Sequence, residues 1–168
     1  MGIENFHTWL KSNYKACFFG CQMKNKFDYI YIDINHLLHN SMNGIKTEVE
    51  FVDRLYKSLD LLFCNFLPTK NVVIGIDGAS PYSKIILQRK RRLQSVAKLD
   101  VDKISPILLT PGTEFMKKVN NYIQLYVEKM QGRYRYVDIT FEYLSADIPD
   151  EGEIKIFKKM LDYSKADP

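Results

Sequence analysis

Two apolar segments of this chain each end in an aspartate, and this pattern constrains both the fold and the chemistry. The first covers residues 29 to 33 and ends in Asp33, and the second covers residues 72 to 77 and ends in Asp77. Short, almost continuous apolar runs are typical of strands that are covered on both faces, as in a parallel sheet. Because the carboxyl ends of parallel strands meet at one edge, where open α/β folds bind ligands, we expect the two carboxylates to lie close together.

A third acidic cluster follows a segment in which apolar and polar residues alternate. The alternation, over residues 137 to 143, predicts a half-exposed strand at an edge of the sheet. Several carboxylates in one place repel one another unless a cation lies between them, and oxygen ligands favour hard divalent ions. The sequence therefore predicts a site for Mg²⁺ or Mn²⁺ with four candidate ligands: Asp33, Asp77, Glu151 and Glu153.

Each of these acids also has a structural interpretation. An aspartate at the end of a strand often accepts hydrogen bonds from the amides of the following turn, as Asp33 and Asp77 would. Glu151 and Glu153 open a predicted helix, where acidic side chains complement the positive end of the helix dipole, and Asp150 stands where an N-cap would. The recurrence of acids after three predicted strands favours the metal-site hypothesis.

A strongly basic segment, residues 84 to 92, lies between the second aspartate and the acidic cluster. On a helix, spacings of three and four residues place four of its side chains in one stripe: Lys84, Gln88, Arg91 and Arg92. Arginine offers forked donors and lysine a mobile point charge, so this stripe suits a phosphate group. A solvated helix face is the alternative.

His39 stands six residues after Asp33, near the mouth of the same predicted crevice. Its ring offers a surface on which a nucleic-acid base can stack, although a single histidine is more often an ordinary surface residue.

Helical patterns separate the predicted strands. A capping box, Thr47 to Glu50, opens the clearest helix, which Pro68 ends. Further helices are predicted at the start of the chain, over residues 84 to 95, after residue 113, and over the last segment, whose apolar positions are Ile154, Phe157 and Leu161. Strands that alternate with helices predict one α/β domain over residues 1–168, with a mainly parallel sheet in three layers.

Composition limits the class of protein. A chain of 168 residues with 46% hydrophobic and 26% charged residues is long enough for one folded domain, and its net charge of +4 concentrates in the basic segment. No run approaches the roughly 18 to 20 apolar residues of a membrane span. Three cysteines give an odd count without a disulfide pattern, which favours a reducing compartment, the cytosol or else the nucleus. The pair Cys17 and Cys21 has no evident second pair to complete a zinc site.

Five segments, in order, resemble the amino-terminal part of the Xrn-type 5′→3′ exoribonuclease family. They are the opening residues 1–9, residues 31–40 around Asp33 and His39, residues 76–81 after Asp77, residues 107–116 with the run Thr110 to Met116, and residues 149–155. The resemblance covers nearly the whole chain.

This resemblance implies a role for each candidate residue. Asp33, Asp77, Glu151 and Glu153 would be divalent-metal ligands. Lys84, Gln88, Arg91 and Arg92 would form the pocket for the 5′-monophosphate of single-stranded RNA, and His39 would stack on its first base. The implied fold is the nuclease core shared with flap endonucleases and PIN domains.

The chain also departs from the family pattern. His36 and Asp150 stand where the family usually has glycine, and Ile154 stands where it has histidine. The family's next strand carries two further aspartates, which the chain does not reach before Pro168. We therefore expect a fragment with an incomplete sheet, whose parent supplies the rest of the catalytic domain.

Two alternatives to an exoribonuclease stay open. A non-catalytic module that binds RNA ends would retain the basic helix while holding metals poorly. A structure-specific DNA flap nuclease has the related core, but the segment from Thr110 to Met116 disfavours it.

Overall fold

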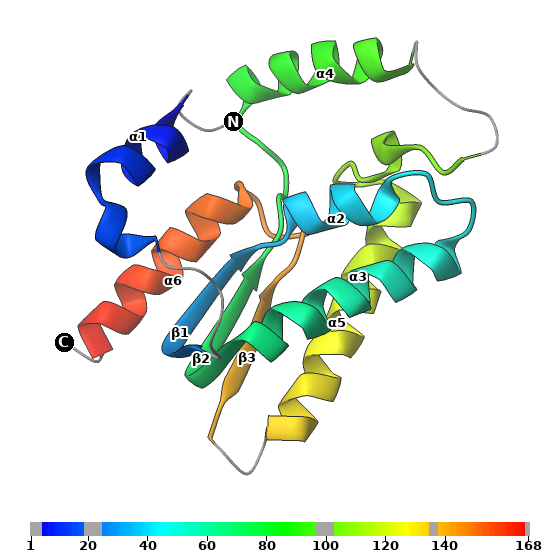
Figure 1. Cartoon of the computed structure of the whole chain (residues 1–168). Coiled ribbons are helices and arrows are strands. Elements are labelled where there is room, and N and C mark those ends of the chain that lie inside the picture. The colour runs from blue at the N-terminus through cyan, green and yellow to red at the C-terminus, as the bar shows by residue number, and fades with distance from the viewer. Residues whose placement is uncertain (1–4, 19–24, 97–102, 135–137, 167–168) are drawn as a thin grey trace.

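Three parallel strands form a sheet between two layers of helices (Figure 1). The computed structural model describes residues 5–18, 25–96, 103–134 and 138–166. Within them the sheet has the order β1-β2-β3, with β1 at Asn25–Asp33, β2 at Phe66–Gly75 and β3 at Thr140–Leu144. The predicted α/β class, the parallel pairing and the edge position of the alternating strand are confirmed.

Helices connect and cover the strands. α3 and α5 lie on one face of the sheet and α6 lies on the other (Figure 1). The α-helices are α1 at Phe6–Asn13, α2 at Asn35–Met42, α3 at Glu48–Asn65, α4 at Tyr82–Val96, α5 at Glu114–Tyr134 and α6 at Gly152–Ala166. Two short 3₁₀ turns, η1 at Lys15–Cys17 and η2 at Pro106–Leu108, complete the elements of the described residues.

The predicted capping box begins α3. The Oγ1 atom of Thr47 accepts a hydrogen bond of 3.2 Å from the Glu50 amide, and Oε2 of Glu50 accepts one of 2.8 Å from the Lys46 amide. The helix ends earlier than Pro68, because β2 begins at Phe66. At Pro68 the strand pairs with β1 alone, since β3 joins only from Asn71, so proline stands outside the three-stranded part of the sheet.

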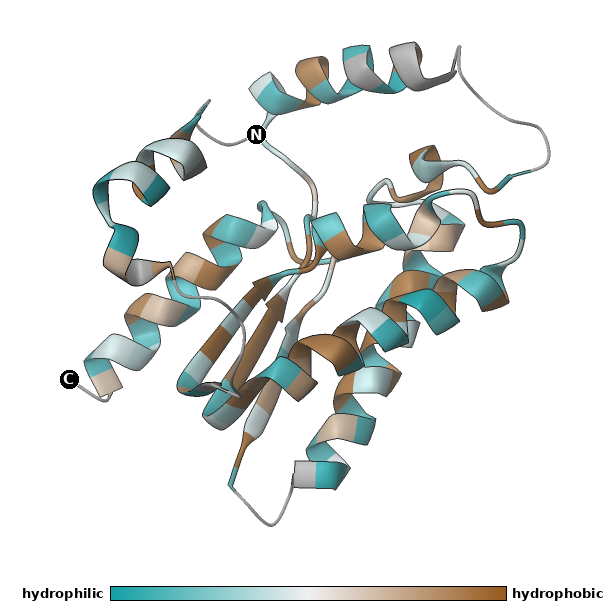
Figure 2. Ribbon diagram, viewed as in Figure 1, coloured by the Kyte–Doolittle hydropathy of each residue, from teal (hydrophilic) through white to brown (hydrophobic). Residues whose placement is uncertain are grey.

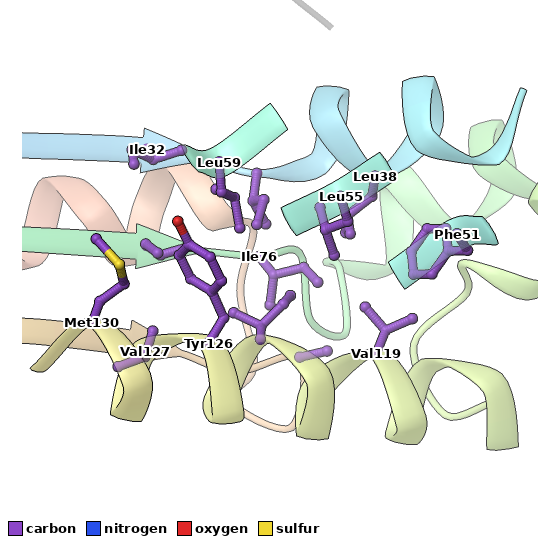
Figure 3. Close-up of a cluster of buried hydrophobic side chains, with 14 of the residues drawn as sticks. Ile32, Leu38, Phe51, Leu55, Leu59, Ile76, Val119, Tyr126, Val127 and Met130 are labelled. Carbon is purple, nitrogen blue, oxygen red and sulfur yellow. The ribbon is translucent and has the colours of Figure 1, made fainter. Parts of the chain in front are cut away.

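The main core fills the space between the sheet and the two helices α3 and α5. Every fourth residue of α3 is buried there, from Phe51 through Leu55 and Leu59 to Phe63. Figure 3 shows Tyr126 of α5 directed toward the sheet, opposite Leu59. The hydroxyl of Tyr126 donates to Asp60 at 2.8 Å, so this buried ring keeps its polar atom satisfied.

The hydrophobic cluster on the second face of the sheet is smaller. The side of α6 that packs on it differs from the prediction. Ile154, Phe157 and Leu161 are 45%, 60% and 60% exposed, so the apolar positions predicted for the last helix point outward. Ile156 packs on Val73 and Leu144 instead. Figure 2 accordingly shows hydrophobic residues along the strands and both hydrophobic and hydrophilic residues along α6.

A glycine in β2 allows close packing of α6. A Cβ atom on Gly75 would lie 2.9 Å from Cγ1 of Ile156, a distance that real side chains do not show. The absence of a side chain at this position lets Ile156 and the first turn of α6 approach the strand closely. None of the helices in the described part of the chain has the length and apolar character needed to span a lipid bilayer.

We expect Leu59→Ala to lower the free energy of unfolding by about 2 to 5 kcal/mol, because it removes a fully buried side chain and leaves a cavity. Leu61→Ala is the matched control, since Leu61 lies on the same helix and is 65% exposed; its effect should stay within about 0.5 kcal/mol. Urea denaturation followed by circular dichroism measures both. Equal losses would contradict the described core.

Candidate functional site

Asp33 and Asp77 lie at neighbouring strand ends and share one asparagine. Asp33 is the last residue of β1, and Asp77 stands two residues beyond the end of β2. Oδ1 of Asp33 accepts hydrogen bonds from the backbone amide of Asn35 at 3.1 Å and from its Nδ2 at 2.6 Å. Oδ1 of Asn35 accepts from the Asp77 amide at 3.3 Å. The sequence interpretation missed Asn35, although its position two residues after a strand-end aspartate is typical of such a turn.

The first residue of α6 meets both aspartates. The amide of Gly152 donates to Oδ1 of Asp77 at 2.8 Å, and a Cβ atom at Gly152 would lie 3.3 Å from Oδ1 of Asp33. The two carboxylates therefore adjoin the amino end of one helix, where the helix dipole favours negative charge. The structure brings Asp33 and Asp77 together, as predicted.

The two predicted glutamates lie on either side of Gly152. The carboxylate of Glu151 forms an ion pair with Nζ of Lys84, and these side chains are only 22% and 17% exposed. Glu153 is exposed in the first turn of α6. No group of three or more His, Cys, Asp or Glu side chains that could hold a metal ion occurs among the described residues. The site with four carboxylates stays a prediction.

The predicted basic stripe occurs on α4. Nε2 of Gln88 donates to Oγ of Ser80 at 3.0 Å, and a guanidinium nitrogen of Arg92 donates to Oε1 of Gln88 at 3.3 Å. Lys84, Gln88 and Arg92 are half-buried, whereas Arg89 is exposed, so one face of the helix turns toward the protein. The side chain of Arg91 lies outside the described part of the structure, as does Cys21.

A cavity of about 790 Å³ unites this stripe with the strand ends. The predicted site residues that line it are His39, Asp77, Lys84, Gln88 and Arg92. Its other wall is formed by the C-terminal half of α2 and by residues between 103 and 111. The last of these residues belong to the segment 107–116, which the sequence interpretation singled out but did not place in a site. The cavity thus joins cations from α4, a carboxylate from the sheet edge and apolar side chains from the far wall.

His39 faces this cavity in its neutral form at neutral pH. Burial lowers the pKa of His39 below its usual value; the charge of nearby Asp77 opposes this and the neighbouring His36 adds to it. Because the net shift is downward, the ring is a neutral, flat surface.

The turn that carries Asp77 is held against the loop before α6. The amide of Gly78 donates to the carbonyl of Asp150 at 2.9 Å, and the Asp150 amide donates to the carbonyl of Ala79 at 3.1 Å. Nζ of Lys155, which is 5% exposed, donates to the carbonyls of Ile76 at 2.9 Å and Ser145 at 2.8 Å. These bonds fix the backbone on both sides of Asp77.

Asp150 has a backbone conformation that favours glycine. Its φ of 88° lies in the left-handed region, which explains physically why glycine suits this position in the family that the chain resembles. The Asp150 carboxylate forms an ion pair of 2.7 Å with Lys158, which turns its charge toward the outer face of α6. The extra acid therefore has a cation of its own.

Comparison with known proteins gives a consistent result over almost the whole chain. Residues 1–167 match the family model described as XRN 5′-3′ exonuclease N-terminus. The chain is 28% identical over 182 residues to 5′-3′ exoribonuclease 1 of Saccharomyces cerevisiae, which covers 93% of the chain and 12% of that protein. Identity to human 5′-3′ exoribonuclease 1 is 27% over 185 residues, covering 94% of the chain and 11% of that protein. The Drosophila melanogaster 5′-3′ exoribonuclease 2 homolog is 24% identical over 210 residues, with 93% and 23% covered. The chain thus spans about an eighth of the length of the first two relatives.

We expect Gly78→Ala to destabilise the fold by about 1 to 3 kcal/mol or more, because the added Cβ would lie 2.0 Å from the carbonyl oxygen of Ile148. Gly132→Ala is the matched control, since nothing lies within 4 Å of a Cβ there and the residue is helical. It should raise stability by about 0.5 to 1 kcal/mol. Thermal unfolding of the two variants distinguishes them, and a neutral Gly78→Ala would contradict the close packing of the Asp77 turn.

Proposed function

Because the chain belongs to the XRN 5′-3′ exonuclease N-terminus family, we propose that it forms part of the active site of a 5′→3′ exoribonuclease. The proposed substrate is single-stranded RNA with a 5′-monophosphate. The exoribonuclease names of the relatives support the reaction class, and the basic stripe supports the choice of RNA end. The free, exposed thiol of Cys64 fits a reducing compartment, and we place the activity in the cytosol rather than the nucleus.

One observation carries this proposal: a single cavity is lined both by the cationic side of α4 and by Asp77. Lys84, Gln88 and Arg92 would bind the terminal phosphate through charge-assisted and amide hydrogen bonds, with Arg91 as a fourth group. His39 would stack on the first base with its neutral ring. The scissile phosphate would then lie toward the strand ends that carry Asp33 and Asp77.

Hard oxygen donors at those strand ends suit Mg²⁺ or Mn²⁺. The carboxylates of Asp33 and Asp77 meet at Gly152, and Glu151 and Glu153 flank the same glycine, so we assign the four acids as metal ligands. A bound divalent ion would make water more acidic and stabilise negative charge on the leaving oxygen.

The proposed reaction is hydrolysis of the first internucleotide bond. A water oxygen bonds to the phosphorus as the bond between phosphorus and the 3′ oxygen breaks, and that oxygen takes up a proton. The products are a nucleoside 5′-monophosphate and an RNA shortened by one residue that again carries a 5′-phosphate. The residues of the cavity bind, orient and enclose the end of the strand.

A non-catalytic module that binds RNA ends is the second candidate. It is favoured by the engagement of Glu151 with Lys84, which leaves Asp77, hydrogen-bonded to the Gly152 amide, and Asp33 as the two carboxylates near Gly152. Both candidates require selective binding of a 5′-phosphate, and only the first requires hydrolysis.

For the first candidate, the full-length protein that contains this chain, incubated with Mg²⁺ and a 5′-monophosphorylated oligoribonucleotide, should release nucleoside 5′-monophosphates. Asp77→Asn should lower the rate at least ~100-fold, because it removes a charged metal ligand, while RNA affinity without metal stays within about threefold. The amide oxygen of asparagine retains an acceptor for the Gly152 amide, so the fold should survive. Chromatography of the products measures the rate.

Asp53→Asn is the control, because Asp53 is an exposed partner of Lys57 on α3. Full activity of Asp77→Asn would contradict the assigned metal ligand. Phosphate-selective binding without hydrolysis by the unmodified full-length protein would support the second candidate.

The phosphate pocket has a matched pair of test variants. Arg92→Gln should reduce the preference for a 5′-phosphate over a 5′-hydroxyl end about tenfold or more, since a charge-assisted hydrogen bond contributes roughly 1.5 to 3 kcal/mol. Arg89→Gln removes the same charge from an exposed position outside the cavity lining, so it should weaken binding of both ends equally. Fluorescence anisotropy at fixed salt measures six affinities, those of the unmodified chain and of the two variants for each RNA end. An equal loss of preference in both variants would place the pocket elsewhere.

A further inference from the structure

The ion pair between Lys84 and Glu151 joins two sites that the proposed function treats as separate. Lys84 lines the cavity from the first turn of α4, and Glu151 directly precedes α6. Both side chains are largely buried, at 17% and 22% exposure. One candidate ligand for the phosphate is therefore bound to one candidate ligand for the metal.

The other described cavity residues of α4 have different partners. Arg92 donates to the side-chain oxygen of Gln88, and Gln88 donates to the hydroxyl oxygen of Ser80. Both acceptors are uncharged. Among the α4 side chains that the structure describes in the cavity lining, Lys84 is the one with a carboxylate partner. Lys84 therefore connects the basic stripe of α4 to the acidic cluster before α6.

Separating a largely buried ion pair is costly when only one partner is satisfied afterwards. The remaining charge would lie in a poorly solvated position, and such a charge is strongly unfavourable. A phosphate that binds Lys84 would leave Glu151 in this state, and a cation that binds Glu151 would do the same to Lys84. When both ligands bind, each partner regains an opposite charge, so each ligand should strengthen the binding of the other.

We propose that Lys84 and Glu151 form a specificity-determining pair in which a 5′-phosphate releases Glu151 for the divalent metal. The proposal rests on the proposed function and gives its end specificity a mechanism. Glu151 directly precedes Gly152, whose amide donates to Asp77, so its release frees a carboxylate one residue from a group that contacts the strand end. An RNA with a 5′-hydroxyl end leaves Lys84 bound to Glu151, and the metal site stays incomplete. Discrimination between ends then appears in kcat as well as in binding.

The test measures Mn²⁺ affinity by electron paramagnetic resonance of free Mn²⁺, with adenosine 5′-monophosphate and adenosine as probes. These two molecules differ only in the phosphate and contain no scissile bond, and Mn²⁺ binding to each alone is subtracted. Saturating adenosine 5′-monophosphate should tighten Mn²⁺ binding to the chain about fivefold or more. Adenosine should change it less than about twofold.

Two variants that each remove one cation from the cavity separate the pair from general electrostatics. Lys84→Met should bind Mn²⁺ more tightly than the unmodified chain without any nucleotide, because Glu151 has lost its partner, and adenosine 5′-monophosphate should add nothing further. Arg92→Gln should need more adenosine 5′-monophosphate for saturation but should keep the full tightening. With 5′-phosphorylated and 5′-hydroxyl RNA, the ratio of kcat values should fall toward one in Lys84→Met alone.

The possible failures are distinguishable. Equal tightening by adenosine 5′-monophosphate in Lys84→Met and the unmodified chain would overturn the pair, because direct contact between metal and phosphate would then suffice. Equal affinity of the chain for adenosine 5′-monophosphate and adenosine would contradict the phosphate pocket of the proposed function. Absence of Mn²⁺ binding under every condition would contradict both the metal site and the pair.

Discussion

The parallel pairing of β1 with β2 is the constraint on which the site depends. In this register Asp33 is opposite Gly75, so the two chain segments leave the sheet at the same level. Asp77 follows two residues later and α6 begins at the same edge, where the Gly152 amide donates to Asp77 and Asp33 lies near the same glycine. An antiparallel arrangement or a shift by one residue would send these carboxylates to different places. The chemistry therefore rests on the pairing of strands more than on any single loop.

Burial of charge is the cost of this arrangement, and hydrogen bonds offset it. Burial lowers the pKa of Lys155, while the charges of Asp77, Asp150 and Asp147 act in the opposite direction. The ammonium group keeps two carbonyl acceptors from the residues that follow β2 and β3. A buried donor without such acceptors would be strongly unfavourable, so the lysine links the two strand ends and favours one arrangement of the turn.

Sequence patterns predicted those elements that are decided by a signal within the element itself. The apolar runs before Asp33 and Asp77 gave β1 and the end of β2, and the capping box gave the first turn of α3, because one periodicity or hydrogen bond decides each of them. The outward face of α6 was not predictable, since it depends on how closely Ile156 approaches Gly75. Spacing alone also could not reveal the partner of Glu151. That partner, Lys84, is distant in the chain, and the two side chains meet only through the tertiary fold.

Asn35 links the two strand ends, and its two hydrogen bonds limit the residues that can replace it. Its side-chain amide donates a hydrogen bond to the carboxylate of Asp33 and accepts one from the backbone amide of Asp77. One planar group is therefore a donor at one strand end and an acceptor at the other. Aspartate has the same length but lacks the donor, and glutamine has both functions on a longer stem. An uncharged side chain of this length therefore couples the two strand ends, and neither replacement would keep both hydrogen bonds in place.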